Sequence, residues 1–132
     1  MVARRRAIAD TSLFISLEAH RFDGTALRDL ELGVSVVTLG ELRLGVVSAR
    51  NDPEAASRRL ATYELARQFE PLPIDERVSD AWALLVAQLR AEGRKAPVND
   101  TWIAATAVAH EMPVATQDKD YDAMPGLTVI KL

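Results

Sequence analysis

Segments typical of short β-strands alternate with segments typical of helices along the whole chain, and this order restricts the fold more than any other feature. The helical segments place apolar residues three and four positions apart. The strand segments are short and mainly apolar, at residues 7–9, 34–37, 69–74, 113–116 and 127–130. This alternation is typical of βαβ units, so we predict an α/β fold with a mainly parallel sheet. Pro71 and Pro73 restrict the third strand to a short one or to a sheet edge.

Length and composition narrow the class of protein. At 132 residues, of which 48% are hydrophobic, the chain is expected to form a single ordered domain over residues 1–132. The absence of cysteine excludes disulfides and thiolate metal sites, and the net charge of −3 does not by itself indicate nucleic-acid binding. Asp10 interrupts the first apolar run too early for a signal peptide, and no apolar stretch approaches the roughly 18 residues of a membrane span. We therefore expect a cytoplasmic protein.

Cap and turn residues predict where the first helices begin and end. Thr25 can cap a short helix that Gly33 closes, before the strand at 34–37. Thr38 and Glu41 have the spacing of a capping box, so the next helix is predicted to begin at Thr38.

Three further helices have recognisable starts. Asp52 precedes one of them, and Asp75 caps the most clearly amphipathic one, which Gly93 ends. Asn99 or Asp100 is predicted to open the last helix, which is rich in alanine and almost entirely apolar. This last helix is therefore predicted to be central and buried.

Four acidic residues lie at strand ends or helix starts. In a parallel sheet these positions share one edge, which is where open α/β sheets bind ligands. Each acid alone is readily explained as a helix cap or turn residue, but four carboxylates at one edge repel one another unless a cation holds them. Carboxylate oxygens suit Mg²⁺ or Mn²⁺. The four are Asp10, Glu41, Asp100 and Asp118.

Other reaction classes fit the sequence less well. His20 and His110 have no suitable partners for nucleophilic catalysis, and no glycine-rich phosphate loop is present. A receiver-like phosphoacceptor domain needs paired acids after the first strand and a separate lysine, whereas Lys119 adjoins the last acid. A haloacid-dehalogenase-like phosphatase needs a second Asp where Ser12 stands. A binding module that kept the fold without activity is disfavoured by four intact acids.

The segments around these acids resemble motifs of the PIN-domain family, and within it the VapC-type toxins of bacterial toxin–antitoxin pairs. The likeness covers nearly the whole chain, with four motifs in the family's order. Any one motif is weakly specific, whereas the ordered set is strongly specific. The motifs are Asp10-Thr11-Ser12, residues 38–45 (TLGELRLG), residues 99–107 (NDTWIAATA) and residues 116–121 (TQDKDY).

The resemblance implies a compact three-layer α/β/α sandwich and a Mg²⁺- or Mn²⁺-dependent endoribonuclease. Asp10, Glu41, Asp100 and Asp118 fall on the family's four acidic positions, as both metal ligands and catalytic residues. The fourth position varies in the family, so Asp120 is an alternative to Asp118. Supporting hydroxyl groups fall at Thr11, Ser12 and Thr116.

The predicted reaction is hydrolysis of an RNA phosphodiester bond, with Glu41 as a metal ligand or as the group that orients the attacking water. Arg43 is the predicted phosphate contact, with a solvent-facing helix residue as its alternative. The triplet Arg4–Arg6 either contacts RNA or is only a solvated strand entrance. An RNA-processing or nucleic-acid-binding PIN-like module outside toxin–antitoxin systems is the alternative function.

Similar proteins are homodimers inhibited by a small VapB-like antitoxin, which implies the same partners here. The apolar residues at 39–47 and 53–68 either form the groove and dimer surfaces or belong to the core.

Overall fold

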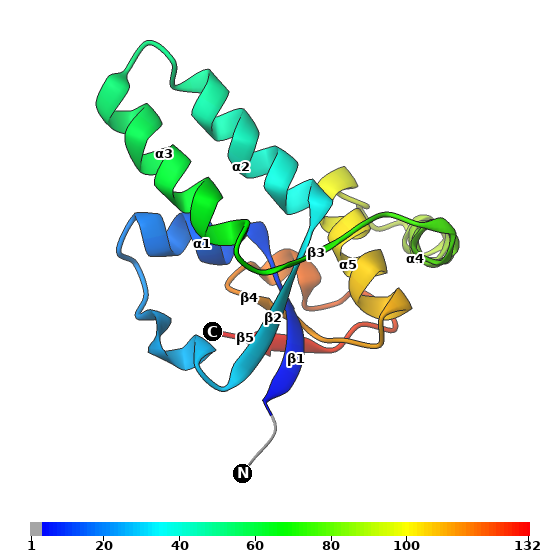
Figure 1. Cartoon of the computed structure of the whole chain (residues 1–132). Helices are drawn as coiled ribbons and strands as arrows, with labels where there is room; N and C mark the ends of the chain where they lie inside the picture. Colours follow the sequence, from blue (N-terminus) through cyan, green and yellow to red (C-terminus); the bar gives the residue numbers. More distant parts are fainter. Residues whose placement is uncertain (1–3) are drawn as a thin grey trace.

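The computed structural model describes residues 4–132 and has a five-stranded sheet of order β3-β2-β1-β4-β5 (Figure 1). All four strand pairings are parallel, which confirms the predicted α/β class. The proline-containing strand lies at one edge, as predicted, because proline cannot donate a ladder hydrogen bond. The strands are β1 (Arg5–Ala9), β2 (Leu30–Ser35), β3 (Glu70–Leu72), β4 (Val114–Thr116) and β5 (Val129–Lys131).

Helices cover both faces of the sheet and form the predicted three layers. One face packs on α4 and α5 through a core that includes Ile8 and Val114, and the other packs on α1 and the α2–α3 pair through a core that includes Ala9 and Ala115. Neighbouring strand residues thus face opposite layers. The helices are α1 (Thr11–Glu18), α2 (Val36–Ser48), α3 (Pro53–Ala66), α4 (Glu76–Ala91) and α5 (Val98–Ala109), with 3-10 turns η1 (Gly24–Leu27) and η2 (Lys119–Tyr121).

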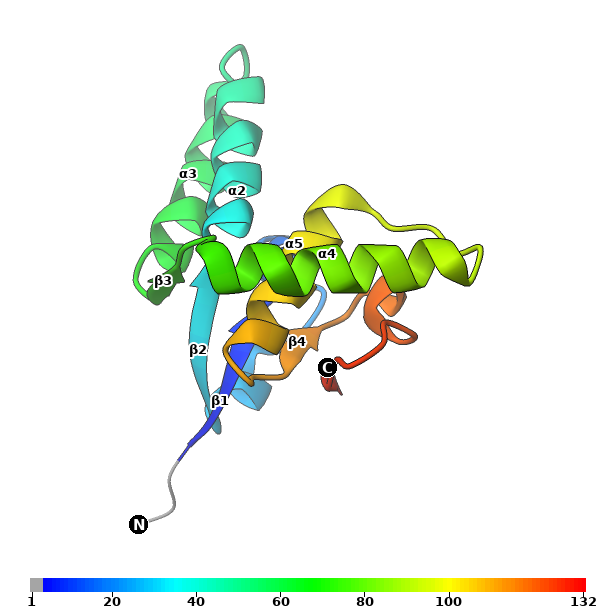
Figure 2. The same cartoon turned by 90° about the vertical axis from the view of Figure 1, so that its right-hand side faces the viewer.

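The antiparallel α2–α3 pair projects beyond the sheet, whereas α4 lies across the opposite layer beside α5 (Figure 2). Asp75 caps α4, as predicted, and α3 begins after Asp52, which caps it; each Asp accepts a hydrogen bond from a backbone N–H three residues later. α4 ends before Gly93, which has a φ of +68°. No helix within residues 4–132 is long and apolar enough to cross a membrane.

The predicted helix from Thr25 to Gly33 is wrong. Only a 3-10 turn forms, capped by Asp23, and Gly33 lies inside β2. A Cβ atom at Gly33 would lie 2.9 Å from Leu72 Cδ1 on β3. Glycine at this position therefore allows a side chain of the neighbouring strand to approach the backbone, and does not end a helix.

The predicted start of α2 is also wrong. The strand ends at Ser35, whose hydroxyl accepts a hydrogen bond from Val37 N at 3.1 Å and caps the helix. The β-branched Val36 and Val37 favour a strand in isolation, but this cap places them in the first helical turn. Thr38 and Glu41 consequently lie within α2 and do not form a capping box.

Candidate active site

The first acid, Asp10, is a buried carboxylate that accepts hydrogen bonds from several donors. It follows β1 directly and caps α1 by accepting from Ser12 N at 3.2 Å. Thr116 Oγ1 donates to Asp10 Oδ2 at 2.9 Å, and the Tyr121 hydroxyl donates to Asp10 Oδ1 at 2.8 Å. Asp10 is 2% exposed. The hydrogen bonds compensate part of the cost of burying this charge.

Asp100 lies in the first turn of α5, where its side chain does not cap the helix. The helix begins after Pro97 without a side-chain cap, which differs from the predicted start at Asn99 or Asp100. The Tyr121 hydroxyl lies 3.2 Å from Asp100 Oδ1. One phenolic oxygen therefore links the carboxylates of Asp10 and Asp100.

Two tryptophans brace the turn that carries Asp100. Trp82 Nε1 on α4 donates to Thr101 Oγ1 at 3.3 Å, and Thr101 donates to the Pro97 carbonyl at 2.8 Å. The rings of Trp82 and Trp102 stack with centroids 4.5 Å apart. The start of α5 is therefore fixed by α4 rather than by a cap.

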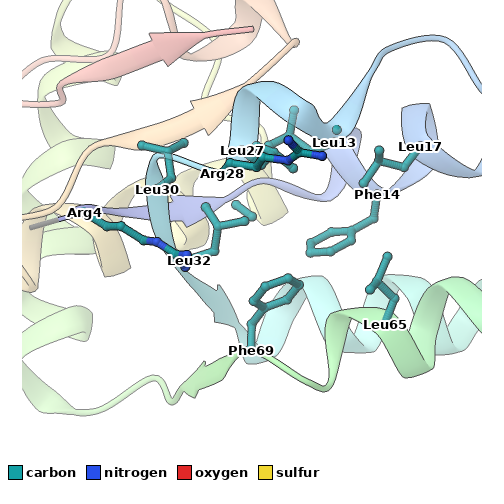
Figure 3. Close-up of a pocket in the computed structure, with 12 residues that line it drawn as sticks. Arg4, Leu13, Phe14, Leu17, Leu27, Arg28, Leu30, Leu32, Leu65 and Phe69 are labelled. Atoms are coloured by element: carbon teal, nitrogen blue, oxygen red, sulfur yellow. The ribbon is translucent and has the colours of Figure 1, made fainter. Parts of the chain in front are cut away.

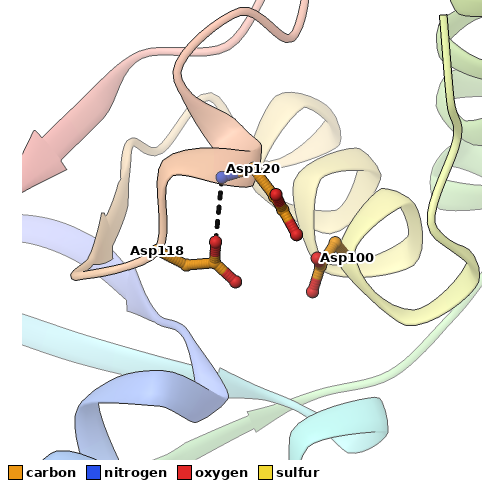
Figure 4. A group of neighbouring side chains, drawn as sticks. All are labelled: Asp100, Asp118 and Asp120. Carbon is orange, nitrogen blue, oxygen red and sulfur yellow. Dashed lines mark hydrogen bonds between the residues drawn. The ribbon is translucent and has the colours of Figure 1, made fainter.

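Asp118 and Asp120 lie around η2, opposite Asp100 (Figure 4). Asp120 N donates to Asp118 Oδ1 at 2.9 Å, and Asp118 N donates to Thr116 Oγ1 at 2.8 Å. One carboxylate oxygen from each of Asp100, Asp118 and Asp120 lies within 4.8 Å of the other two. Three oxygen donors at this separation are suited to a hard divalent cation.

Glu41 joins the site through threonine hydroxyls. Thr11 Oγ1 donates to Glu41 Oε1 at 2.8 Å and lies 2.9 Å from Thr38 Oγ1. Because Thr11 has one proton, which it donates to Glu41, the wholly buried Thr38 is the donor to Thr11. This chain holds Glu41 beside the residue that follows Asp10, outside the Asp100–Asp118–Asp120 group.

Burial and nearby negative charges raise the pKa of two groups in the site. Burial, and next the charge of Asp10, raise the pKa of Asp100 from 3.8 to about 6; Asp118 and Asp120 add to this effect, and the Tyr121 hydrogen bond opposes it. Burial, with the charges of Asp10 and Asp100, also raises the pKa of Tyr121 above its ordinary value. The phenol therefore stays protonated at neutral pH.

The basic residues predicted to contact RNA lie away from the acids. The Arg43 guanidinium is 5.5 Å from the centre of the Tyr63 ring on α3. Residues two apart on a helix point in nearly opposite directions, so Arg43 and Glu41 lie on different sides of α2. Arg5 and Arg6 begin β1, at the end opposite Asp10, and Arg6 pairs with Glu70 at 3.1 Å. This placement fits a strand entrance.

Ser12 supports the site less directly than Thr116. Its hydroxyl lies 3.3 Å from Thr116 Oγ1 and accepts from Gln117 N at 3.4 Å. Tyr121 is a site residue that the sequence pattern does not predict. The available signal is that Tyr121 is the one aromatic residue in this otherwise polar motif.

Two cavities lie near the helical layer formed by α1, α2 and α3. One of them has Glu41 as the only predicted acid in its lining, together with Ile15, Glu18, Leu42, Gly45 and Arg59. The other, of about 300 Å³, is largely apolar, with Phe14 and Phe69 in its wall and Arg4 and Arg28 among its lining (Figure 3). The second cavity contains none of the predicted acids.

Comparison with known proteins identifies the family. The sequence matches the PIN domain over residues 7–127. The chain belongs to the PIN-domain family.

Relatives within the family are VapC proteins. The chain is 63% identical to Ribonuclease VapC4 of Mycobacterium tuberculosis, with 97% of this chain and 98% of that protein covered. It is 39% identical to Ribonuclease VapC5 of the same organism, with coverage of 95% and 92%. The solved VapBC-5 toxin–antitoxin structure from that organism superposes with a TM-score of 0.84 at 36% identity, covering 96% of this chain and 98% of that one. The predicted VapC-type resemblance is confirmed.

Proposed function

We propose that this protein is a metal-dependent endoribonuclease and the toxin of a toxin–antitoxin pair. The observation that carries the proposal is the approach of the Asp100, Asp118 and Asp120 oxygens to within 4.8 Å, next to the buried Asp10. The 63% identity to a protein named a ribonuclease supports the same activity for this chain.

The donor set fits Mg²⁺ or Mn²⁺. It consists of carboxylates, without histidine or cysteine, and like charges at this distance favour a cation between them. Asp10, Asp100 and Asp118 would hold the ion, with Asp120 as a further or alternative ligand beside Asp118. When bound, a divalent cation lowers the pKa of a coordinated water and neutralises charge on a phosphoryl oxygen.

The protein's own residues position the carboxylates for this chemistry. Thr116 and Tyr121 fix the two oxygens of Asp10, and Thr11 fixes Oε1 of Glu41. Oε2 of Glu41 then remains to ligate the ion or to take the proton of an attacking water. These hydrogen bonds keep the carboxylate oxygens in place before substrate binds, which lowers the reorganisation needed during reaction.

RNA would approach along the cavity that Glu41 and Arg59 line together. A Cβ at Gly45 would lie 3.5 Å from Arg59 Cδ, so the Arg59 side chain runs across Gly45 on the same side of α2 as Glu41. Residues 41 and 45 are one helical turn apart. Arg59 is therefore better placed than Arg43 for a phosphate contact near the acids, and guanidinium groups suit such contacts.

A VapB-like antitoxin is the proposed protein partner, because the solved relative is a toxin–antitoxin assembly. The predicted partner surface on α2 and α3 is partly exposed: Leu44 is 65% exposed and Val47 is 47% exposed, whereas Leu42 belongs to the core. Leu84 on α4 and Val98 on α5 are also exposed, at 75% and 67%. Such surfaces are consistent with the proposed homodimer, which light scattering of the purified protein would test.

The decisive experiment is cleavage of total cellular RNA by purified protein with and without Mn²⁺ or Mg²⁺, beside an Asp100→Asn control. Discrete fragments that need the metal and are missing from the control would support the endoribonuclease. Equal cleavage by the parent and the variant would contradict the site assignment. A module that has lost activity would give no fragments and no stabilisation by Mn²⁺.

A further inference from the structure

Tyr121 connects two of the predicted metal ligands. Its ring is 0% exposed and lies in the core between the sheet and α5, with Ile8, Ile103 and Met124. Its hydroxyl lies 2.8 Å from Oδ1 of Asp10 and 3.2 Å from Oδ1 of Asp100. Within residues 4–132, no other side-chain hydroxyl bonds to two carboxylates. The position of this oxygen is fixed by the packing of the ring.

The two carboxylates depend on this hydroxyl to different extents. Asp10 also accepts from Thr116 Oγ1 and Ser12 N, so it keeps two donors when the phenol is removed. The Asp100 carboxylate has no other hydrogen-bond partner in the part of the chain that the structure describes. Loss of the hydroxyl therefore frees Asp100 to rotate while leaving Asp10 held.

We propose that Tyr121 is a positioning residue that holds Asp10 and Asp100 at the separation needed to share one divalent cation. The proposal rests on the metal-dependent function given above. Two anionic side chains repel each other. The single phenolic proton of Tyr121, donated to Asp10 at 2.8 Å and shared with Asp100 at the longer 3.2 Å, keeps them together before the ion arrives. Outer-sphere partners of this type typically change metal affinity by about 10- to 100-fold. Tyr121 would thus increase metal affinity without touching the metal.

The test is Mn²⁺ binding by the full-length Tyr121→Phe variant, measured by calorimetry. We expect the dissociation constant to rise about tenfold, because the ring and its packing remain while the bond to Asp100 is lost. Cleavage should recover at saturating Mn²⁺, which a folding defect would not allow. The matched control is Tyr63→Phe. Tyr63 is the other tyrosine of the chain, and its ring contacts Arg43 and Arg67 rather than the acids.

The outcomes separate this proposal from the function itself. Equal or tighter binding by the Tyr121→Phe variant, with normal binding by the parent, overturns the role of Tyr121 alone. Absence of Mn²⁺ binding by the parent overturns the metal-dependent function and this role with it.

A second measurement covers the case in which Tyr121→Phe does not fold. In the Tyr63→Phe variant labelled with ¹³C-tyrosine, Tyr121 gives the one remaining tyrosine signal, and Mg²⁺ should shift it. An unchanged signal at saturating Mg²⁺ overturns the proposal.

Discussion

Replacing Asp100 by Asn should abolish cleavage and at the same time stabilise the metal-free protein at pH 7. The pKa of Asp100 is raised from 3.8 to about 6, so ionising it in the folded protein is unfavourable. At about 1.4 kcal/mol for each pH unit, this displacement corresponds to about 3 kcal/mol. Screening by solvent at this half-buried carboxyl reduces the figure to about 1–2 kcal/mol. Asn has nearly the same shape and avoids the charge.

The stabilisation by Asn depends on pH because Asp100 loses its proton at a higher pH in the folded protein than in the unfolded chain. A group whose pKa is raised on folding binds its proton more tightly in the folded state. Its contribution to the free energy of unfolding is therefore complete below pH 4. That contribution is lost as the pH rises through about 6, because the folded protein must then ionise Asp100. The stabilisation by Asn should therefore appear between pH 4 and pH 6 and persist at pH 7.

Thermal unfolding in EDTA measures this effect. At pH 7 the melting temperature of Asp100→Asn should exceed that of the parent by roughly 3–8 °C, and at pH 4 the two should be nearly equal. Added Mn²⁺ should stabilise the parent but not the variant. Asp80→Asn, at an exposed position on α4, is the control for loss of one negative charge. A variant less stable than the parent at pH 7 without metal would refute the reasoning.

Three further predictions follow from single contacts. Thr116→Val removes a wholly buried hydroxyl between two site residues and should cost about 1–3 kcal/mol in denaturant unfolding; an unchanged midpoint would contradict this. Gly33→Ala places a methyl group against Leu72 and should lower the free energy of unfolding by about 1–3 kcal/mol. An unchanged free energy of unfolding would contradict this and show that the β3 edge shifts freely. Arg59→Ala should weaken RNA binding and flatten its salt dependence more than Arg43→Ala, and the reverse order would favour Arg43.

The parallel sheet was predictable because strand–helix alternation is a property of many residues at once, whereas the three layers were implied by the family resemblance. Element boundaries depend on one or two local contacts. Ser35 caps α2 because β2 ends there. In the sequence, Thr38, four residues after Val34, is an equally good candidate for the cap. The role of Gly33 required knowledge of β3, which pairs with β2 from almost forty residues away.

Asp10, Asp100 and Asp118 were predictable individually, since each follows a strand or lies in the first turn of a helix, whereas Glu41 lies inside α2. Their assignment as metal ligands stays a prediction, as does the single-domain organisation. The grouping of Asp120 with Asp118 depends on the 3-10 turn η2. This turn has three residues, which is too short for a periodic sequence pattern to predict it. Tyr121 could not be assigned because its importance comes from the position of one oxygen between two distant segments.

The pairing of β1 with β4 at the centre of the sheet has a consequence for the timing of activity. Asp10 receives its bond from Thr116, which is 106 residues further along the chain, and another from Tyr121. A growing polypeptide on the ribosome therefore contains the first carboxylate long before the residues that orient it. On the proposed site assignment, we expect cleavage competence only once translation has passed the η2 segment and β4 has inserted beside β1. A nuclease assembled in this way should be inactive for most of its own synthesis.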